Sequence, residues 1–147
     1  MKNALTNLLK DIKHEITLYS LVSSFLFYEL ADVNWLGFYL VEEDGLYLGP
    51  FQGLPACIYI PKGKGACGRC AQTKEIILLP NVKKDPNYIA CHAETQSEVV
   101  FPIIVNDEVI AVLDIDSLSL NRFTTSDIEN ITACVKIIEN HLQQIKR

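Results

Sequence analysis

The sequence predicts an α+β fold in which helices at both ends of the chain cover an antiparallel sheet, as one domain spanning residues 1–147. Two observations predict it. Apolar residues recur at helical spacing near both ends of the chain, whereas the middle alternates short branched or aromatic runs with tight turns. Because 49% of the residues are hydrophobic, a chain of this length can bury a core without disulfides or a metal.

Residues 1–30 have the spacing of two amphipathic helices or of one bent helix. Their apolar residues fall at helical intervals, and the pattern ends near Leu30. The residues that carry this spacing are Leu5, Leu8, Leu9, Ile12, Ile16, Leu18, Leu21, Val22 and Phe25.

The middle of the chain alternates short strands with one short helix. An acidic turn ending at Gly45 separates the first two strands, and Pro61 and Pro80 close the next two. We expect a helix over 68–73, after the glycine-containing loop 62–65. The expected strands cover residues 35–41, 46–51, 57–60 and 76–79.

The following segment combines an irregular loop with a hairpin. Periodicity is lost over 81–96, and loops of this kind carry a large share of binding and catalytic groups. Strands over 98–105 and 108–116 follow, joined by a tight Asn106-Asp107 turn. In the second of these strands, Val109, Ala111, Leu113 and Ile115 are expected on one face, with Ile110 and Val112 on the other.

The last helix is expected to begin at a capping box formed by Thr124 and Asp127. Its apolar stripe advances in alternating steps of three and four residues, so it either packs on the sheet or pairs with the same helix of a second subunit, which would make a homodimer. The stripe consists of Ile128, Ile131, Val135, Ile138 and Leu142. Cys134 beside it is expected to be a small buried hydrophobe.

Charge and hydropathy exclude two classes of partner. The net charge is −5, with acidic and basic residues interspersed, whereas a nucleic-acid surface needs a clustered basic stripe. No apolar run approaches membrane-spanning length, and the N-terminus lacks the apolar segment of a signal peptide. We therefore expect a cytoplasmic protein with no nucleic-acid or membrane partner, in a compartment that keeps thiols reduced.

Four of the five cysteines lie within residues 57–91, namely Cys57, Cys67, Cys70 and Cys91. The last three and His92 offer four zinc ligands, but an adjacent Cys-His pair is poorly shaped for chelation, so we predict no metal and no cofactor. A thioredoxin-like dithiol is disfavoured because that motif sits in a parallel strand–helix unit. Cys67 is expected just before the helix over 68–73, whose dipole would stabilise its thiolate.

Asp114 and Asp116 lie two residues apart in one predicted strand, so their side chains share a face about 7 Å apart. They mark either the polar end of a solvent-facing strand or a buried pair. Apolar residues on both faces favour burial, and buried carboxyls need partners or a task. With Glu98 on a neighbouring strand, the three carboxyls would raise one another's pKa, and they could hold a proton for acid catalysis or bind an ammonium group.

Two aromatic residues, Trp35 and Tyr39, lie four apart in another predicted strand and therefore share a face. They either fill the core or form the apolar wall of a pocket.

Seven motifs occur in order along residues 18–138. They are Asn34–Tyr39 (NWLGFY), Leu48–Gly53 (LGPFQG), Pro55–Cys57 (PAC), Gly65–Gly68 (GACG), Ile89–Cys91 (IAC), Ser97–Val100 (SEVV) and Val112–Ser117 (VLDIDS). Together they closely resemble the free methionine-(R)-sulfoxide reductase family. Cys57, Cys67 and Cys91 also occur at the family's spacing of ten and then twenty-four residues.

The resemblance implies a GAF fold, with a six-stranded antiparallel sheet and helices on its faces. It implies reduction of the R epimer of free methionine sulfoxide to methionine, with a cysteine sulfenic acid and an intramolecular disulfide as intermediates and thioredoxin as the reductant. By position, Cys91 matches the catalytic cysteine, and Cys57 and Cys67 match its resolving partners. The substrate-binding residues that the resemblance implies are Glu98, Asp114, Asp116, Trp35 and Tyr39.

The chain departs from the family pattern at four positions: Cys70 is additional, and Asn87, Tyr88 and His92 replace the family's Gly, His and Asp around Cys91. Cys70 is either an inert core thiol or an additional redox partner. Two other functions fit the same fold, a small-molecule sensor and a redox-sensing module without turnover. A plain ligand sensor has no use for three cysteines at this spacing, and a redox sensor would form the disulfide but reduce no sulfoxide.

Overall fold

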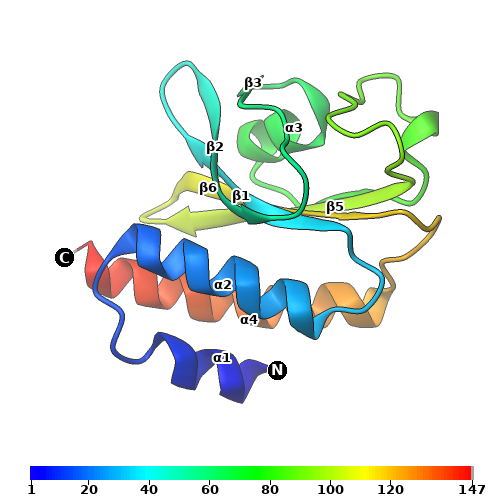
Figure 1. Ribbon diagram of the computed structural model, residues 1–147. Coiled ribbons are helices and arrows are strands. Elements are labelled where there is room, and N and C mark those ends of the chain that lie inside the picture. The colour runs from blue at the N-terminus through cyan, green and yellow to red at the C-terminus, as the bar shows by residue number, and fades with distance from the viewer. Residues whose placement is uncertain (147) are drawn as a thin grey trace.

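The computed structural model describes residues 1–146 and contains one six-stranded sheet in the order β3-β2-β1-β6-β5-β4, with every neighbouring pair antiparallel (Figure 1). The strands are β1 (Trp35–Val41), β2 (Gly45–Gln52), β3 (Tyr59–Pro61), β4 (Ile77–Leu79), β5 (Ser97–Val105) and β6 (Glu108–Ser117). The helices are α1 (Lys2–Leu9), α2 (Glu15–Glu29), α3 (Gly65–Thr73), the 3₁₀ turn η1 (Val82–Lys84) and α4 (Thr125–Ile145). The α+β architecture predicted from the sequence is confirmed.

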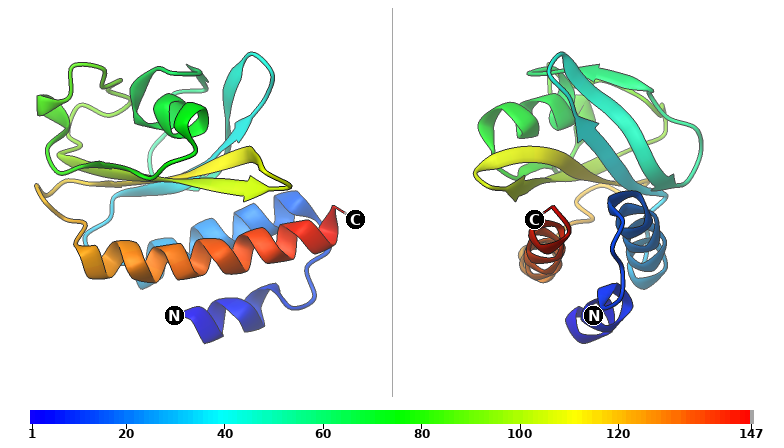
Figure 2. Two further views of the ribbon diagram at one scale, coloured as in Figure 1. Left: turned by 180° about the vertical axis from the view of Figure 1, so that it is seen from behind. Right: turned by 90° about the vertical axis from the view of Figure 1, so that its left-hand side faces the viewer.

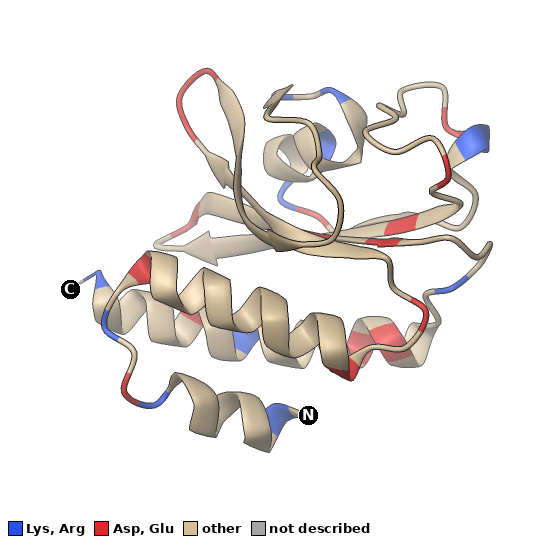
Figure 3. Cartoon of the chain, viewed as in Figure 1, with Lys and Arg blue, Asp and Glu red and all other residues tan. Residues whose placement is uncertain are grey.

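Two long helices, α2 and α4, cover one face of the sheet, and α1 lies beneath them as a further layer (Figure 2). We call this side the helical face. The N-terminal pattern thus resolves into two helices rather than one bent one, and the second ends at Glu29. Charged residues on α2 are confined to its ends, Glu15 and Glu29, which leaves the rest of the helix uncharged (Figure 3).

The core of the helical face combines the inner sides of these helices with one side of the central strands. Its strand members include Leu36, Phe38, Leu113 and Ile115, each fully buried. The stripe of α4 packs into the same core, with Ile131, Val135, Ile138 and Leu142 buried within the single chain. Of the two expected roles of the stripe, the structure shows packing on the sheet. A homodimer stays a prediction, and its subunits would have to meet through a surface other than this stripe.

The start of α4 and the turn between β5 and β6 lie where the sequence predicted them. Thr124 and Asp127 form the predicted capping box, in which each side chain accepts a hydrogen bond from the other's backbone N–H. Asn106 and Asp107 both adopt positive φ, as a two-residue hairpin turn requires.

One face assignment in β6 was wrong. A register shift between Ile103 and Ile104 of β5 leaves Ile110 as an extra residue between the pairs Ala111–Ile103 and Val109–Ile104. Ile110 therefore packs against the core of the helical face, while Val109 packs on the other side, the reverse of the expected positions. Beyond the bulge the alternation holds, so Asp114 and Asp116 share the face opposite the helices.

The opposite face carries α3 and the irregular segment 85–96, and we call it the site face (Figures 1 and 2). Its apolar cluster is separate from the core of the helical face. The cluster includes Trp35, Tyr39, Cys67, Cys70 and Val112. Along the described chain, no helix combines the length and apolarity needed to cross a bilayer.

Candidate active site

Three carboxyl groups lie side by side on the site face of the central strands. Glu98 of β5 is paired directly with Asp116 of β6. Asp114 precedes Asp116 by two residues in β6 and points to the same side of the sheet. Only 5 to 6% of each of these residues is exposed. We call Glu98, Asp114 and Asp116 the carboxyl cluster. Figure 3 shows acidic positions on the sheet itself as well as on the loops and helix ends.

Burial raises the pKa of every member of the carboxyl cluster, and the neighbouring carboxyls add to the effect. The pKa of Asp114 rises to about 8. Those of Glu98 and Asp116 rise well above their ordinary values, after burial mainly through Asp114 and Glu98 respectively. Among the described residues, Asp114 Oδ1 and Asp116 Oδ1 have no hydrogen-bond partner. The cluster therefore retains protons near neutral pH and has free acceptor positions for a ligand.

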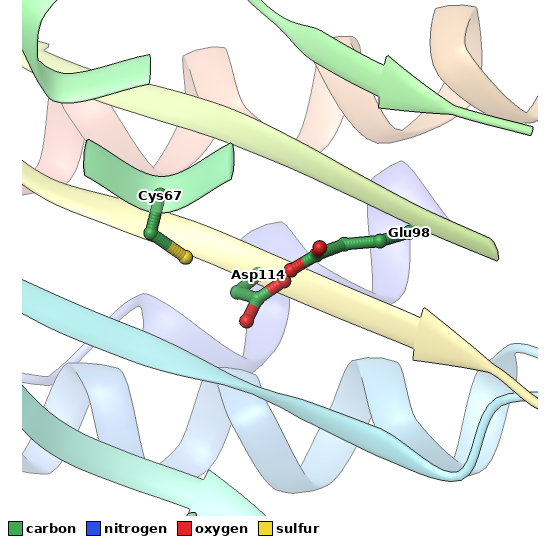
Figure 4. A group of neighbouring side chains, drawn as sticks. All are labelled: Cys67, Glu98 and Asp114. Carbon is green, nitrogen blue, oxygen red and sulfur yellow. The ribbon is translucent and has the colours of Figure 1, made fainter. Parts of the chain in front are cut away.

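Helix α3 places Cys67 directly over this cluster. The helix begins at Gly65, three residues earlier than predicted, and the Gly68 N–H donates to the Lys64 carbonyl oxygen at 3.0 Å. Gly65 itself adopts a φ of +63°, which other residues rarely take. Cys67 is thus in the first turn of the helix rather than before it. Its side chain points at Asp114 (Figure 4). The thiol and one oxygen each of Glu98 and Asp114 lie within 4.8 Å of one another.

The expectation that the helix dipole would stabilise a Cys67 thiolate was wrong. Burial raises the pKa of Cys67 well above its ordinary value, and the negative charge of Asp114 raises it further. The nearby carboxyls and the loss of water outweigh the partial charge of the helix N-terminus. In this structure Cys67 is therefore a protonated thiol.

A disulfide joins Cys57 and Cys91, with their Cα atoms 5.4 Å apart. Cys67, Cys70 and Cys134 remain free and buried. The disulfide links Cys57, in the loop before β3, to Cys91, 34 residues later in the irregular segment 85–96. We call residues 85–96 the segment over the site. The zinc set considered from the sequence is not assembled here, since Cys91 is in the disulfide; the thiol that meets potential ligands is Cys67.

Cys57 lies in a loop rather than in the predicted strand 57–60, because β3 begins only at Tyr59. Side chains donate hydrogen bonds to several carbonyl groups of this loop, while the Ile58 carbonyl accepts from Leu48 of β2. Trp35 Nε1 donates to the Leu54 oxygen at 3.0 Å, and Tyr39 Oη donates to the Cys57 oxygen at 2.9 Å. These two bonds hold the loop over residues 53–58, which we call the Cys57 loop, against β1.

His92 adds a third support to the same loop. Its Nε2 donates to the Pro55 carbonyl oxygen at 2.9 Å, and its ring lies 6.3 Å from that of Trp35. Trp35 also stacks on Tyr39, with ring centroids 6.0 Å apart. His92, which replaces the family's Asp, therefore adds a hydrogen bond between the two segments that the disulfide joins.

The segment over the site is tied to α3 and to the loop before it by three side chains that were not predicted to have this role. Arg69 of α3 forms an ion pair with Asp85. Asn87 Nδ2 donates to the Gly63 oxygen at 3.2 Å. Ile89 packs directly over Gly65, where an added Cβ would meet it at about 3.2 Å. These contacts position the segment that carries Cys91.

A small cavity of about 20 Å³ lies between the segment over the site, α3 and the carboxyl cluster. That volume holds one water molecule or an ion, but not an amino acid. Its lining residues are Ile60, Gly65, Ala66, Cys67, Tyr88, Ile89, Cys91, His92, Glu98, Asp114 and Asp116.

Most, but not all, of the predicted site residues meet at this cavity. Cys57 approaches it only through its bond to Cys91, and Trp35 and Tyr39 lie behind the Cys57 loop. Cys70 is buried in the apolar cluster of the site face, away from the cavity wall. Ile60, Gly65, Ala66 and Ile89 were not predicted as site residues, since they contribute backbone or apolar surface. The signal for the last three was their place in the GACG and IAC motifs.

Comparisons with known proteins identify the family of the chain. The family model described as GAF domain matches residues 17–142. A relative from Escherichia coli named free methionine-R-sulfoxide reductase is 42% identical over 120 residues, which is 82% of this chain and 73% of the relative.

Two solved structures are also similar. The reduced form of fRMsr of Staphylococcus aureus is 43% identical, covers 96% of this chain and 92% of its own, and superposes with a TM-score of 0.93. Free methionine-R-sulfoxide reductase from Neisseria meningitidis in complex with its substrate is 31% identical, covers 98% and 86%, and gives a TM-score of 0.92. The chain therefore belongs to the GAF-domain proteins and, within them, to the free methionine-R-sulfoxide reductase family of oxidoreductases.

Proposed function

We propose that this protein reduces free L-methionine-(R)-sulfoxide to methionine, with Cys91 as the attacking thiol and Cys57 as its resolving partner. The observation that carries the proposal is a disulfide at the edge of a cavity lined by three buried carboxyls. Cys91 lines that cavity and Cys57 does not. The assignment of the attacking role to Cys91 rests on this difference.

In the first step, the Cys91 thiolate attacks the sulfoxide sulfur, and a carboxyl of the cluster protonates the sulfoxide oxygen. The new bond between the two sulfurs then breaks as the hydroxyl group passes to the Cys91 sulfur, and the proton that Cys91 released returns to the carboxylate. The sulfoxide is reduced by two electrons to the thioether of methionine, and Cys91 is oxidised to a sulfenic acid. Burial keeps the carboxyls protonated near neutral pH, which suits them to donate that proton. We assign the proton to Glu98 or Asp114, each of which places one oxygen within 4.8 Å of the other's and of the Cys67 thiol.

In the second step, the Cys57 thiol attacks the sulfenic acid, and water leaves as the disulfide forms. Cys67 is the other resolving thiol implied by the resemblance, but it is a protonated group against Asp114. We therefore assign resolution to Cys57 and give Cys67 the role of orienting Asp114. An external dithiol, thioredoxin in a cytoplasmic setting, would restore both thiols by exchange.

Preference for the free amino acid follows from the hydrogen-bonding groups around the cavity. The partnerless oxygens of Asp114 and Asp116 can accept hydrogen bonds from an α-ammonium group, which a peptide-bound sulfoxide lacks. Gly65 and Ala66 line the cavity at the start of α3, where unpaired backbone N–H groups suit an α-carboxylate.

The cavity of the disulfide form is too small for this substrate, so the segment carrying Cys91 must move outward when the disulfide is reduced. That movement would bring Trp35 and Tyr39, now behind the Cys57 loop, to the wall of the enlarged pocket. They would then contact the methyl end of the substrate.

The test is consumption of free methionine sulfoxide, with the R and S epimers assayed separately and a peptide-bound sulfoxide beside them, using thioredoxin and its reductase. We expect turnover of the free R epimer alone, and a loss of roughly 10³-fold or more in kcat/KM for Cys91→Ser. Cys134→Ser, which removes a buried thiol on the helical face, is the matched control and should retain full activity. Fully reduced protein that consumes none of these sulfoxides would refute the proposal.

A further inference from the structure

Cys67 and two members of the carboxyl cluster meet in the geometry of a metal site. One ligand atom each of Cys67, Glu98 and Asp114 lies within 4.8 Å of the others, and all three side chains are buried (Figure 4). A tetrahedral zinc ion, with bonds of about 2.3 Å to sulfur and about 2.1 Å to oxygen, holds its ligand atoms about 3 to 4 Å apart. Small side-chain shifts would therefore close this triad around an ion.

A second observation points independently to a cation at the same place. Asp114 Oδ1 and Asp116 Oδ1 are buried and have no partner among the described residues. The nearby Arg69 guanidinium lowers the pKa of Glu98 only as a lesser effect, and it is paired with Asp85. The cluster thus offers three carboxyls and a thiol that can exchange their protons for a bound cation, with little local positive charge to oppose it.

The cavity favours an ion over a larger ligand. Its volume of about 20 Å³ is lined by Cys67 and by all three members of the carboxyl cluster. Such a space accommodates a single metal ion with at most one water. The ligand set of one sulfur and two oxygens selects among ions: magnesium and calcium prefer all-oxygen sites, whereas zinc and cobalt accept thiolate together with carboxylate.

We propose that Cys67, Glu98 and Asp114 form a binding site for a thiophilic divalent cation, in the first place Zn²⁺, with Asp116 or a water as the fourth ligand. Binding displaces the thiol proton of Cys67 and the carboxyl protons of Glu98 and Asp114 to solvent, and it forms one metal–thiolate and two metal–carboxylate bonds. If the site also serves the proposed reduction, the ion occupies the positions that would receive the substrate ammonium. Zn²⁺ would then be a competitive inhibitor of the reductase.

The disulfide form is well suited to the first test, because its remaining thiols are Cys67, Cys70 and Cys134 and no thiol reductant is needed. Titration with Co²⁺ should give one equivalent of binding and the near-ultraviolet charge-transfer band of a cobalt–thiolate bond. Zn²⁺ should displace the cobalt and abolish the band, whereas Mg²⁺ should leave it unchanged.

Variants assign the ligands. Cys67→Ser should remove the charge-transfer band and weaken Zn²⁺ binding by roughly 100-fold or more. Asp114→Asn should weaken binding while keeping any residual thiolate band. Cys134→Ser is the control for a buried thiol outside the site and should bind like the parent protein. Far-ultraviolet circular dichroism shows which variants are folded.

The proposal is overturned if neither the disulfide form nor the reduced form binds Zn²⁺ or Co²⁺ saturably, or if binding survives both Cys67→Ser and Asp114→Asn. Because the titration contains no sulfoxide, its outcome is independent of whether the protein is a reductase. A protein that binds zinc through Cys67 but reduces no sulfoxide would leave this inference standing and remove the proposed function.

Discussion

The two faces of the sheet use the same strands for opposite purposes. On β6, Leu113 and Ile115 point to the helical face and are fully buried in its apolar core. The residues between and after them, Asp114 and Asp116, point to the site face and are almost as deeply buried. Successive side chains of a strand alternate in direction, so one short segment supplies both environments.

The difference between the faces is one of free energy. Burying a leucine or isoleucine side chain contributes about 1.5–3 kcal/mol to folding. Burying a carboxyl without a partner costs free energy, and the group responds by retaining its proton. Burial on the helical face therefore stabilises the fold. Burial of the carboxyls on the site face lowers the free energy of unfolding, and the apolar core offsets this cost. Substitutions on the two faces should separate activity from stability.

The largest effect is expected on activity, from Glu98→Gln on the site face. The variant keeps the shape of the side chain but cannot supply a carboxylic proton, so kcat/KM for free methionine-R-sulfoxide should fall by roughly 10²- to 10⁴-fold. Stability to urea should be unchanged or increased. Glu139→Gln, a carboxyl on α4 that accepts from the Ile104 N–H, is the control and should retain activity. Full activity in Glu98→Gln would remove Glu98 from the mechanism.

The converse effect is expected from Leu113→Ala on the helical face. Truncating this fully buried side chain leaves a cavity in the core and should lower the free energy of unfolding by about 2–5 kcal/mol. The folded fraction should keep its kcat/KM, since Leu113 points away from the site. Urea denaturation and assays at low temperature measure the two quantities. A loss of activity without a loss of stability would mean that the faces are not separable in this way.

The contrast between the faces was predictable from the sequence where alternation is regular and not where it is interrupted. The two-residue spacing of Asp114 and Asp116 placed them correctly on one face. Val109 and Ile110 were assigned to the wrong faces because the bulge opposite Ile103 and Ile104 shifts the alternation by one residue. A bulge depends on how two strands pair, and a single apolar strand such as β6 carries no local sign of it.

The site was predictable in its residue types but not in its protonation. The resemblance to a known family pointed to the carboxyls and cysteines, and the structure brings Cys67, Cys91 and the carboxyl cluster to one cavity. The start of α3 was placed three residues late, so Cys67 was expected just before the helix, with a thiolate stabilised by its dipole. Its pKa depends on groups distant in sequence, such as Asp114, and no local pattern encodes that contact.

The pH dependence of stability should distinguish the faces further. The pKa of Asp114 rises from its ordinary 3.8 to about 8 on folding, so between these values the folded chain retains a proton that the unfolded chain releases. The stabilisation linked to that proton is complete below the ordinary pKa and is lost as the pH rises towards about 8. The slope is at most about 1.4 kcal/mol per pH unit for one group.

Asp114→Asn cannot ionise and should therefore gain stability relative to the parent protein as the pH rises from about 5 to about 8. Urea midpoints measured at intervals across this range give the difference directly. Parallel curves for the two proteins would show that Asp114 titrates normally in the folded chain.

The smallest effect is expected from Tyr39→Phe, which removes one hydroxyl group from the site face. That hydroxyl donates to the Cys57 carbonyl and holds the loop that delivers the proposed resolving thiol. The free energy of unfolding should fall by only about 1 kcal/mol, because the Cys57 backbone is partly exposed and water can replace the bond. Disulfide formation after a single turnover should slow several-fold, while formation of the sulfenic acid keeps its rate.

Tyr59→Phe is a matched control, since its hydroxyl donates to the Asp44 carbonyl away from the disulfide. If Tyr39→Phe forms the disulfide as fast as Tyr59→Phe does, the Cys57 loop is held in place without this tether, and the bonds from Trp35 and His92 suffice.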